Sequence, residues 1–146
     1  MARSGSFNLK ISNNFKSIDI LDLLDLFHSI GWSIDDHNMI CYLPLGDQDF
    51  EWEFLPISHK EAVRSILLDK QKKKEIIGIT ITSEVTNIGL SMLLYPMFDK
   101  ITLAAEINRK TIDGLDVTDF SWYLSTFIPV LEKAGLTIES IECIDG

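Results

Sequence analysis

The chain has 146 residues, of which 46% are hydrophobic, 10% aromatic and 24% charged. This length suits one domain over residues 1–146, and the composition supports a sizeable core and excludes wholesale disorder. The 22 Asp and Glu residues outnumber the 13 Lys and Arg residues, so the net charge is −9. That balance excludes a general nucleic-acid binder, because phosphate-backbone binding needs a basic surface.

The first elements are a flexible start, a strand and a helix. Residues 1–6 are small and polar and are expected to be flexible, and the alternating residues 7–11 predict a short strand. Apolar residues recur at helical spacing over 18–30. Ser17 is the expected N-cap of this helix, and Gly31 is its expected stop.

Two strands and a second helix follow. Residues 39–43 predict a strand, and the strict alternation over 49–54 predicts another, with aromatic rings on one face and carboxylates on the other. Ser58 and Glu61 have the spacing of a capping box. They predict a helix that reaches about Lys72.

The next part of the chain predicts a meander of three strands. Residues 76–82, 88–95 and 101–107 each alternate between apolar and other side chains, and turn-forming residues separate them. A final strand is expected over 137–144.

A third helix is expected between this meander and the last strand. Its apolar residues repeat from Phe120 to Ala134, its cap is Thr118 or Asp116, and Pro129 predicts a kink. The fold class is therefore α+β, with a mostly antiparallel sheet of about six strands and three helices packed mainly on one face.

The search for catalytic chemistry finds no phosphate-binding loop and no nucleophile elbow. The one suggestive cluster is Asp35, Asp36 and His37, with Cys41 nearby, which supplies the residue types of a metal site or a nucleophile triad. We interpret the cluster as a solvated loop and Cys41 as a core residue. The sequence thus predicts no enzyme, no catalytic residues, no metal and no cofactor.

Acidic residues are concentrated in one segment. Residues 35–59 contain six carboxylates and no Lys or Arg: Asp35, Asp36, Asp47, Asp49, Glu51 and Glu53. Such a set is typical of a face that binds a basic partner, or of charged residues that keep a strand edge from pairing with other chains. Both interpretations predict an exposed acidic ladder, so both stay open. The basic run 70–74 is interpreted as a solvated helix end.

The sequence also indicates in which cellular compartment the protein is expected. Cys41 and Cys143 lie in no CxxC motif, the first ten residues lack the apolar core of a signal peptide, and no apolar run of about 18 residues is present. These features predict a cytoplasmic protein without a membrane span.

The segments LSMLLYP, KITLAAEINRKTIDG, DFSWYLSTFIPVLEKAGL and TIESIE follow one another over about residues 75–144. In the order of their predicted elements, in acidity and in size, they resemble the small acidic immunity proteins of bacterial polymorphic-toxin and contact-dependent growth-inhibition systems. The resemblance implies that the chain binds and blocks a cognate toxin domain, commonly a basic nuclease. It implies no particular contact residues.

Two alternatives remain at this point, and the oligomeric state is open. One is a small-ligand protein or enzyme with a pocket between sheet and helices, which Cys41 and His37 would line. The other is a homo-oligomeric structural subunit that uses a strand edge or the last helix. For the immunity protein, Trp52 and Trp122 are candidate anchors, because Trp is enriched among residues that dominate binding energy.

Overall fold

The computed structural model describes residues 4–13, 18–96 and 99–146. The helices in this part of the chain are α1 (Ile20–Ser29), α2 (Lys60–Lys72) and α3 (Phe120–Lys133). The strands are β1 (Gly5–Asn13), β2 (Trp32–Ser33), β3 (Asp35–Asp36), β4 (Met39–Tyr42), β5 (Glu53–Pro56), β6 (Ile77–Ser83), β7 (Gly89–Leu94), β8 (Lys100–Ile107) and β9 (Leu136–Asp145).

All nine strands belong to one antiparallel sheet. Its main order is β3-β4-β6-β7-β8-β1-β9, with β2 paired to β6 and β5 paired to β4. The α+β class and the three helices are confirmed, but the prediction of about six strands is wrong. The short strands β2 and β3 have two residues each, too few to produce an alternating pattern that a sequence could reveal.

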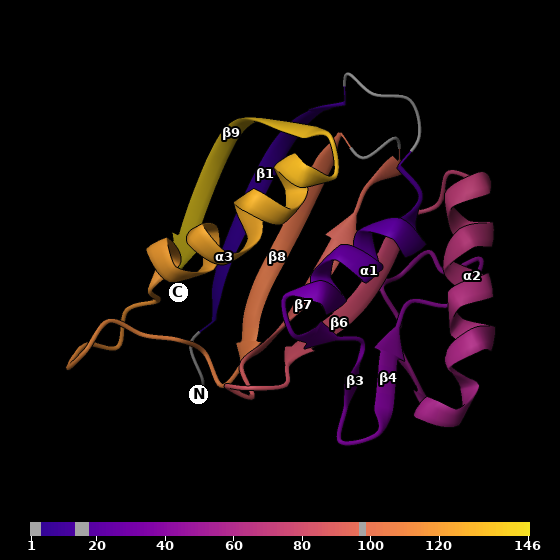
Figure 1. Cartoon of the computed structure of the whole chain (residues 1–146), viewed down its shortest axis with the longest axis horizontal. Coiled ribbons are helices and arrows are strands. Elements are labelled where there is room, and N and C mark those ends of the chain that lie inside the picture. The colour runs from indigo at the N-terminus through magenta and orange to yellow at the C-terminus, as the bar shows by residue number, and fades with distance from the viewer. Residues whose placement is uncertain (1–3, 14–17, 97–98) are drawn as a thin grey trace.

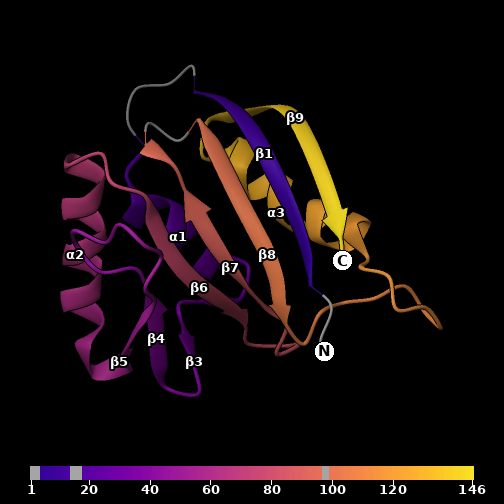
Figure 2. The same cartoon turned by 180° about the vertical axis from the view of Figure 1, so that it is seen from behind.

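The helices lie on one side of the sheet. Figure 1 shows α1 and α3 crossing the near face, while α2 stands beyond β4 and β6 at one end. Figure 2 shows the opposite face, where β6, β7, β8, β1 and β9 run without a helix over them. Gln71 joins α2 to the start of α1, because its Oε1 accepts from Ile20 N at 2.7 Å and its Nε2 donates to Ile18 O at 3.0 Å.

The core lies between this helix layer and the sheet. Alternate residues of the strands are fully or almost fully buried there, as the periodicity predicts: Phe7, Leu9, Ile77, Ile79, Ile81, Leu90, Met92, Leu94, Ile101, Leu103 and Ala105. Rings from both helices complete it, with Phe27 edge-on to Phe127 at 5.5 Å between centroids. Trp122 packs on Tyr123 and Trp32 at 5.0 and 6.3 Å, so this candidate anchor belongs to the helix layer. No helix in the described chain has the length and apolar character to cross a bilayer.

Several element boundaries differ from expectation. Residues 1–3 and Ser17 lie outside the described residues. Gly5 and Ser6, expected to be flexible, belong to β1, where Gly5 is held between Ala105 on β8 and Asp145 on β9. The helix caps are Asp19 and Asp119, whose carboxylates accept from the N3 amides of their helices.

The start of α2 also differs. The predicted capping box is wrong, because a short 3-10 turn, Ile57–His59, leads into this helix and no side chain caps it. The last helix continues through Pro129 to Lys133.

Strand β6 is buried on both faces, unlike the strands that follow it. All of its seven residues are buried, including Gly78, Thr80 and Thr82 on the face away from the helices. The chain between β4 and β5 provides the second cover. Trp52 and Leu43 lie so close to Gly78 that a β-carbon built there would be 2.9 Å from Trp52 Cη2 and 2.6 Å from Leu43 Cδ1. Glycine is therefore required by this close approach.

Replacing Gly78 with alanine is expected to lower the free energy of unfolding by about 1–3 kcal/mol, because the new methyl group must displace Leu43 or Trp52. Urea unfolding followed by circular dichroism measures the change. Ser91→Ala is the control, because Ser91 on β7 lies on the same face of the sheet as Gly78. It should change the free energy of unfolding by less than about 1 kcal/mol. Equal unfolding midpoints for Gly78→Ala and the natural chain would contradict the close approach.

Candidate functional site

A polar row crosses four strands on the face of the sheet that the helices leave uncovered. Its members are Cys41 of β4, Thr80 of β6, Ser91 of β7 and Glu106 of β8, and all four line one pocket. Thr80 and Ser91 are direct cross-strand partners, with 3.4 Å between their hydroxyl oxygens. Ser91 Oγ donates to Glu106 Oε2, also at 3.4 Å. The row forms the floor of what we call the open-face pocket.

Apolar side chains form the walls of the open-face pocket. Phe54 pairs with Cys41 across β5 and β4, so its ring stands on the same face as the floor. Trp52 and Met39 line the pocket beside it, and Ile34 and Ile107 complete the apolar lining. The Phe54 side chain faces solvent, since the residue is 63% exposed. The enclosed volume is about 360 Å³, which falls in the usual range for ligand sites of roughly 300–1,000 Å³.

The charge in the pocket is negative. Among the described residues, its lining includes the carboxylates of Asp36 and Glu106 and no Lys, Arg or His. Asp36 Oδ1 lies 2.8 Å from Nδ1 of His37, whose side chain is 93% exposed. Glu106 meets Ser91, and no ion pair to it occurs within the described chain. The pocket thus presents a carboxylate that has no cationic partner.

The Cys41 thiol is not activated. Burial raises its pKa; a hydrogen bond with Thr80 lowers it by less than burial raises it, and the nearby Glu106 carboxylate adds a further, smaller increase. A nucleophilic cysteine needs the opposite shift, because the thiolate is the reactive form. Cys41 is half-buried at the floor of a pocket, which corrects its interpretation as a core residue.

The wall that carries Trp52 is fixed by buried polar contacts. Lys70 is only 1% exposed; its Nζ donates to Pro44 O at 2.7 Å and lies 3.4 Å from Glu75 Oε1. The same Glu75 oxygen accepts from Gly46 N at 2.8 Å. The interpretation of the basic run as a solvated helix end is therefore wrong at Lys70, because a buried ammonium needs these partners.

The segment 47–52 is a turn and not a strand. Asp47 accepts from the amides of Phe50 and Glu51 at 3.0 and 2.9 Å, and Phe50 adopts a φ of 55°. This geometry breaks the alternation, so the predicted strand over 49–54 is wrong. The strand in this part of the chain is Glu53–Pro56, which pairs with β4.

The six predicted acidic residues consequently have different surroundings. Asp36 lines the open-face pocket, and Asp35 lies beside it on β3. Asp49 and Glu51 are exposed, while Glu53 accepts from the Tyr42 hydroxyl at 3.5 Å. The structure brings all six to the β3–β4–β5 end of the sheet but does not align them as one ladder. Glu106, which completes the pocket charge, lies 70 residues further along the chain than Asp36 and carries no local signal.

The alternative pocket of Cys41 and His37 does not form. Cys41 lines the open-face pocket, whereas the His37 ring points into solvent and is absent from that lining. In the described part of the chain, no three His, Cys, Asp or Glu side chains gather as a metal site would require. The pocket also lies on the uncovered face and not between sheet and helices.

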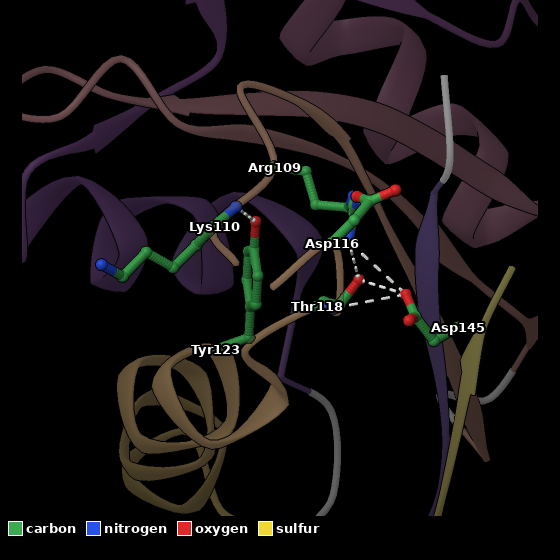
Figure 3. A network of polar contacts seen from close by, with 6 residues as sticks. All are labelled: Arg109, Lys110, Asp116, Thr118, Tyr123 and Asp145. Carbon is green, nitrogen blue, oxygen red and sulfur yellow. Dashed lines mark hydrogen bonds and ion pairs between the residues drawn. The ribbon is translucent and has the colours of Figure 1, made fainter. Parts of the chain in front are cut away.

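A second polar cluster holds the loop between β8 and α3 (Figure 3). Arg109, whose side chain is 9% exposed, donates to Thr118 Oγ1 at 2.7 Å and pairs with Asp116 and Asp145. Thr118 donates in turn to Asp145 Oδ1 at 2.6 Å. The Tyr123 hydroxyl accepts from Lys110 N at 2.9 Å. These contacts fix both ends of the loop to β9 and α3.

The loop that this cluster holds, residues 110–118, projects away from the sheet (Figure 1) and is called the projecting loop below. A bridge between Thr111 and Thr118 closes it. Its outer residues Ile112, Leu115 and Val117 are exposed by 44%, 57% and 38%. Exposed apolar side chains grouped on a fixed loop are typical of an interaction surface.

Replacing Arg109 with methionine is expected to lower the free energy of unfolding by about 1.5–3 kcal/mol, because the contacts of its almost fully buried guanidinium with Thr118 and Asp145 are lost. Arg64→Met is the matched control. Arg64 Nη1 lies 3.6 Å from Asp25, whose side chain is 65% exposed, so its loss should cost less than about 1 kcal/mol. Urea unfolding of both variants gives the comparison, and equal losses would contradict the anchoring role of Arg109.

Comparisons of the chain with protein-family models, with curated proteins and with solved structures gave no match. The function is therefore argued from the open-face pocket, the projecting loop and the charge of the chain.

Proposed function

We propose that the chain is an immunity protein that binds a cognate bacterial toxin domain, a basic nuclease, and neutralises it through an acidic surface. The observation that supports this most is the open-face pocket. It combines two carboxylates with the exposed ring of Phe54 and the partly buried ring of Trp52, and no described Lys, Arg or His lines it, on a chain with net charge −9. Aromatic side chains exposed beside a carboxylate are typical of protein-binding surfaces.

The electrostatics fit a basic partner. A chain with an excess of nine negative charges attracts a positively charged domain at long range and raises its association rate. Asp35, Asp36, Asp47, Asp49, Glu51 and Glu53 all lie at the end of the sheet that holds the pocket. The same acids discourage strand pairing at that edge, so the two interpretations of the acidic segment do not compete.

Charge reversal tests the acidic surface. Replacing Asp49, Glu51 and Glu53 together with lysine is expected to slow association at low salt by about tenfold or more, because it removes the attraction that steers the encounter. Stopped-flow binding to the cognate toxin domain measures the rate, and the difference should shrink as salt is added.

The control makes the same change of charge elsewhere, with lysine at Asp69, Glu132 and Glu139, all of which are exposed. It should slow association less than the first variant does. Equal rates for the two triple variants would reject the assigned surface. A chain that leaves the toxin fully active would reject the proposed function itself.

A second candidate function, the homo-oligomeric subunit, is favoured by the free edge of β9. This ten-residue strand pairs with β1 on one side and, within the described chain, with no strand on the other. Its Ile141 and Ile144 are 41% and 49% exposed. If two copies of β9 pair antiparallel with Ile141 facing Ile141, Glu142 of each copy lies opposite Ser140 of the other. If the pairing is instead centred on Glu142, the two Glu142 carboxylates face each other and repel.

Self-association through β9 predicts a mass twice that of the chain in size-exclusion chromatography with light scattering. Ile141→Lys should return the protein to a monomer, because two ammonium groups would then face each other across the new pair. Ile112→Lys changes a residue of similar exposure in the projecting loop and should leave the dimer intact. A monomer at every concentration of the natural chain would exclude this candidate.

A further inference from the structure

We infer that the open-face pocket receives the guanidinium group of an arginine side chain from the partner protein. This inference rests on the proposed function and names the chemistry by which the partner is recognised. It follows from three properties of the pocket: its charge, its aromatic wall and the planar arrangement of its polar floor.

The charge of the pocket requires a cationic occupant. Glu106 on the floor and Asp36 at the wall face the hollow, and no Lys, Arg or His of the described chain lines it. Within the described chain, the ion-pair partner of Asp36 is the solvent-exposed ring of His37. Closing the pocket with a neutral or anionic group would take Glu106 out of water without a partner, which is unfavourable.

The aromatic wall favours a cation with an apolar stem. Trp52 and Phe54 both line the pocket, and the exposed Phe54 ring has no partner ring among the described residues. A guanidinium stacks on such rings, and the methylene groups that carry it cover apolar surface. The wall thus accommodates both parts of an arginine side chain.

The polar floor distinguishes guanidinium from ammonium. Thr80, Ser91 and Glu106 place oxygen acceptors in a row on adjacent strands, and the two contacts between them are long, at 3.4 Å. Hydroxyl hydrogen bonds are usually about 2.5–3.0 Å long, so these groups are free to form better ones with a ligand. A planar fork with five N–H donors matches a row of acceptors, whereas ammonium is a point charge.

The pocket is already formed, which limits the entropy lost on binding. Lys70 and Glu75 fix the turn at Pro44 and Gly46, and Asp47 fixes the turn that leads to Trp52. Little ordering of the wall is then needed when the arginine enters.

The test titrates the isotope-labelled full chain with Nα-acetyl-arginine amide and follows amide chemical shifts. Shifts are expected at Cys41, Thr80, Ser91 and Glu106 and at the indole of Trp52, with dissociation in the millimolar range that suits a single side chain. The neutral citrulline analogue should cause none of these shifts. The lysine analogue should bind at least about fivefold more weakly.

Two variants sharpen the result. Glu106→Gln should weaken arginine amide binding at least about tenfold, with its spectrum otherwise showing a folded protein. Glu142 lies on β9, on the same face of the sheet as Glu106 but outside the pocket, so the variant Glu142→Gln should bind arginine amide like the natural chain. Shifts scattered over the acidic surface, or equal binding by the two variants, would overturn the inference.

The toxin complex separates this inference from the proposed function. Glu106→Gln should weaken the complex mainly by faster dissociation, because the contact is local and buried. A tight toxin complex that is unaffected by Glu106→Gln, together with no arginine amide shifts, would overturn the pocket inference and leave the proposed function standing. Arginine amide binding without any toxin complex would reject the function alone.

Discussion

A sheet has two faces, and the helices α1 and α3 cover one of them. The strand β6 is nevertheless buried on both, so a segment without regular structure has to cover its second face. That segment lies close because Gly78 has no side chain, and it stays there because the buried Lys70 and the partly exposed Glu75 fix its turn. The open-face pocket is the place where this partial cover ends, between Trp52 and the strands β7 and β8. The pocket has an aromatic wall and a polar floor because the segment that carries Trp52 covers only part of this face of the sheet.

The sequence predicted well what depends on near neighbours. The alternation over 76–82, 88–95 and 101–107 locates β6, β7 and β8 to within a residue or two and identifies their buried sides. It failed over 49–54, where the pattern was as regular but Asp47 held the backbone in a turn. A carboxylate that bonds backbone amides competes with strand formation, and hydrophobic periodicity does not register that competition.

The candidate site was less accessible to sequence reasoning, because it depends on which strands lie side by side. Asp36 was among the expected acids, but Ser91 and Glu106 join it only through the order β4-β6-β7-β8. Conversely, His37 and Cys41 are neighbours in the sequence and diverge in space. Proximity along the chain is weak evidence for a shared site when a tight hairpin lies between the residues.

The pairing of β1 has a consequence for how the protein forms. This strand lies between β8 and β9, and its residue Gly5 pairs with both Ala105 and Asp145. On a ribosome, β1 emerges well before β8 and β9, so its apolar face stays exposed until both of these partners have been synthesised. Contacts between residues this far apart along the chain slow folding, and they favour aggregation before the sheet is complete. The yield of folded protein then depends on the time that β9 takes to complete the sheet, and chaperones that hold the nascent chain would raise that yield.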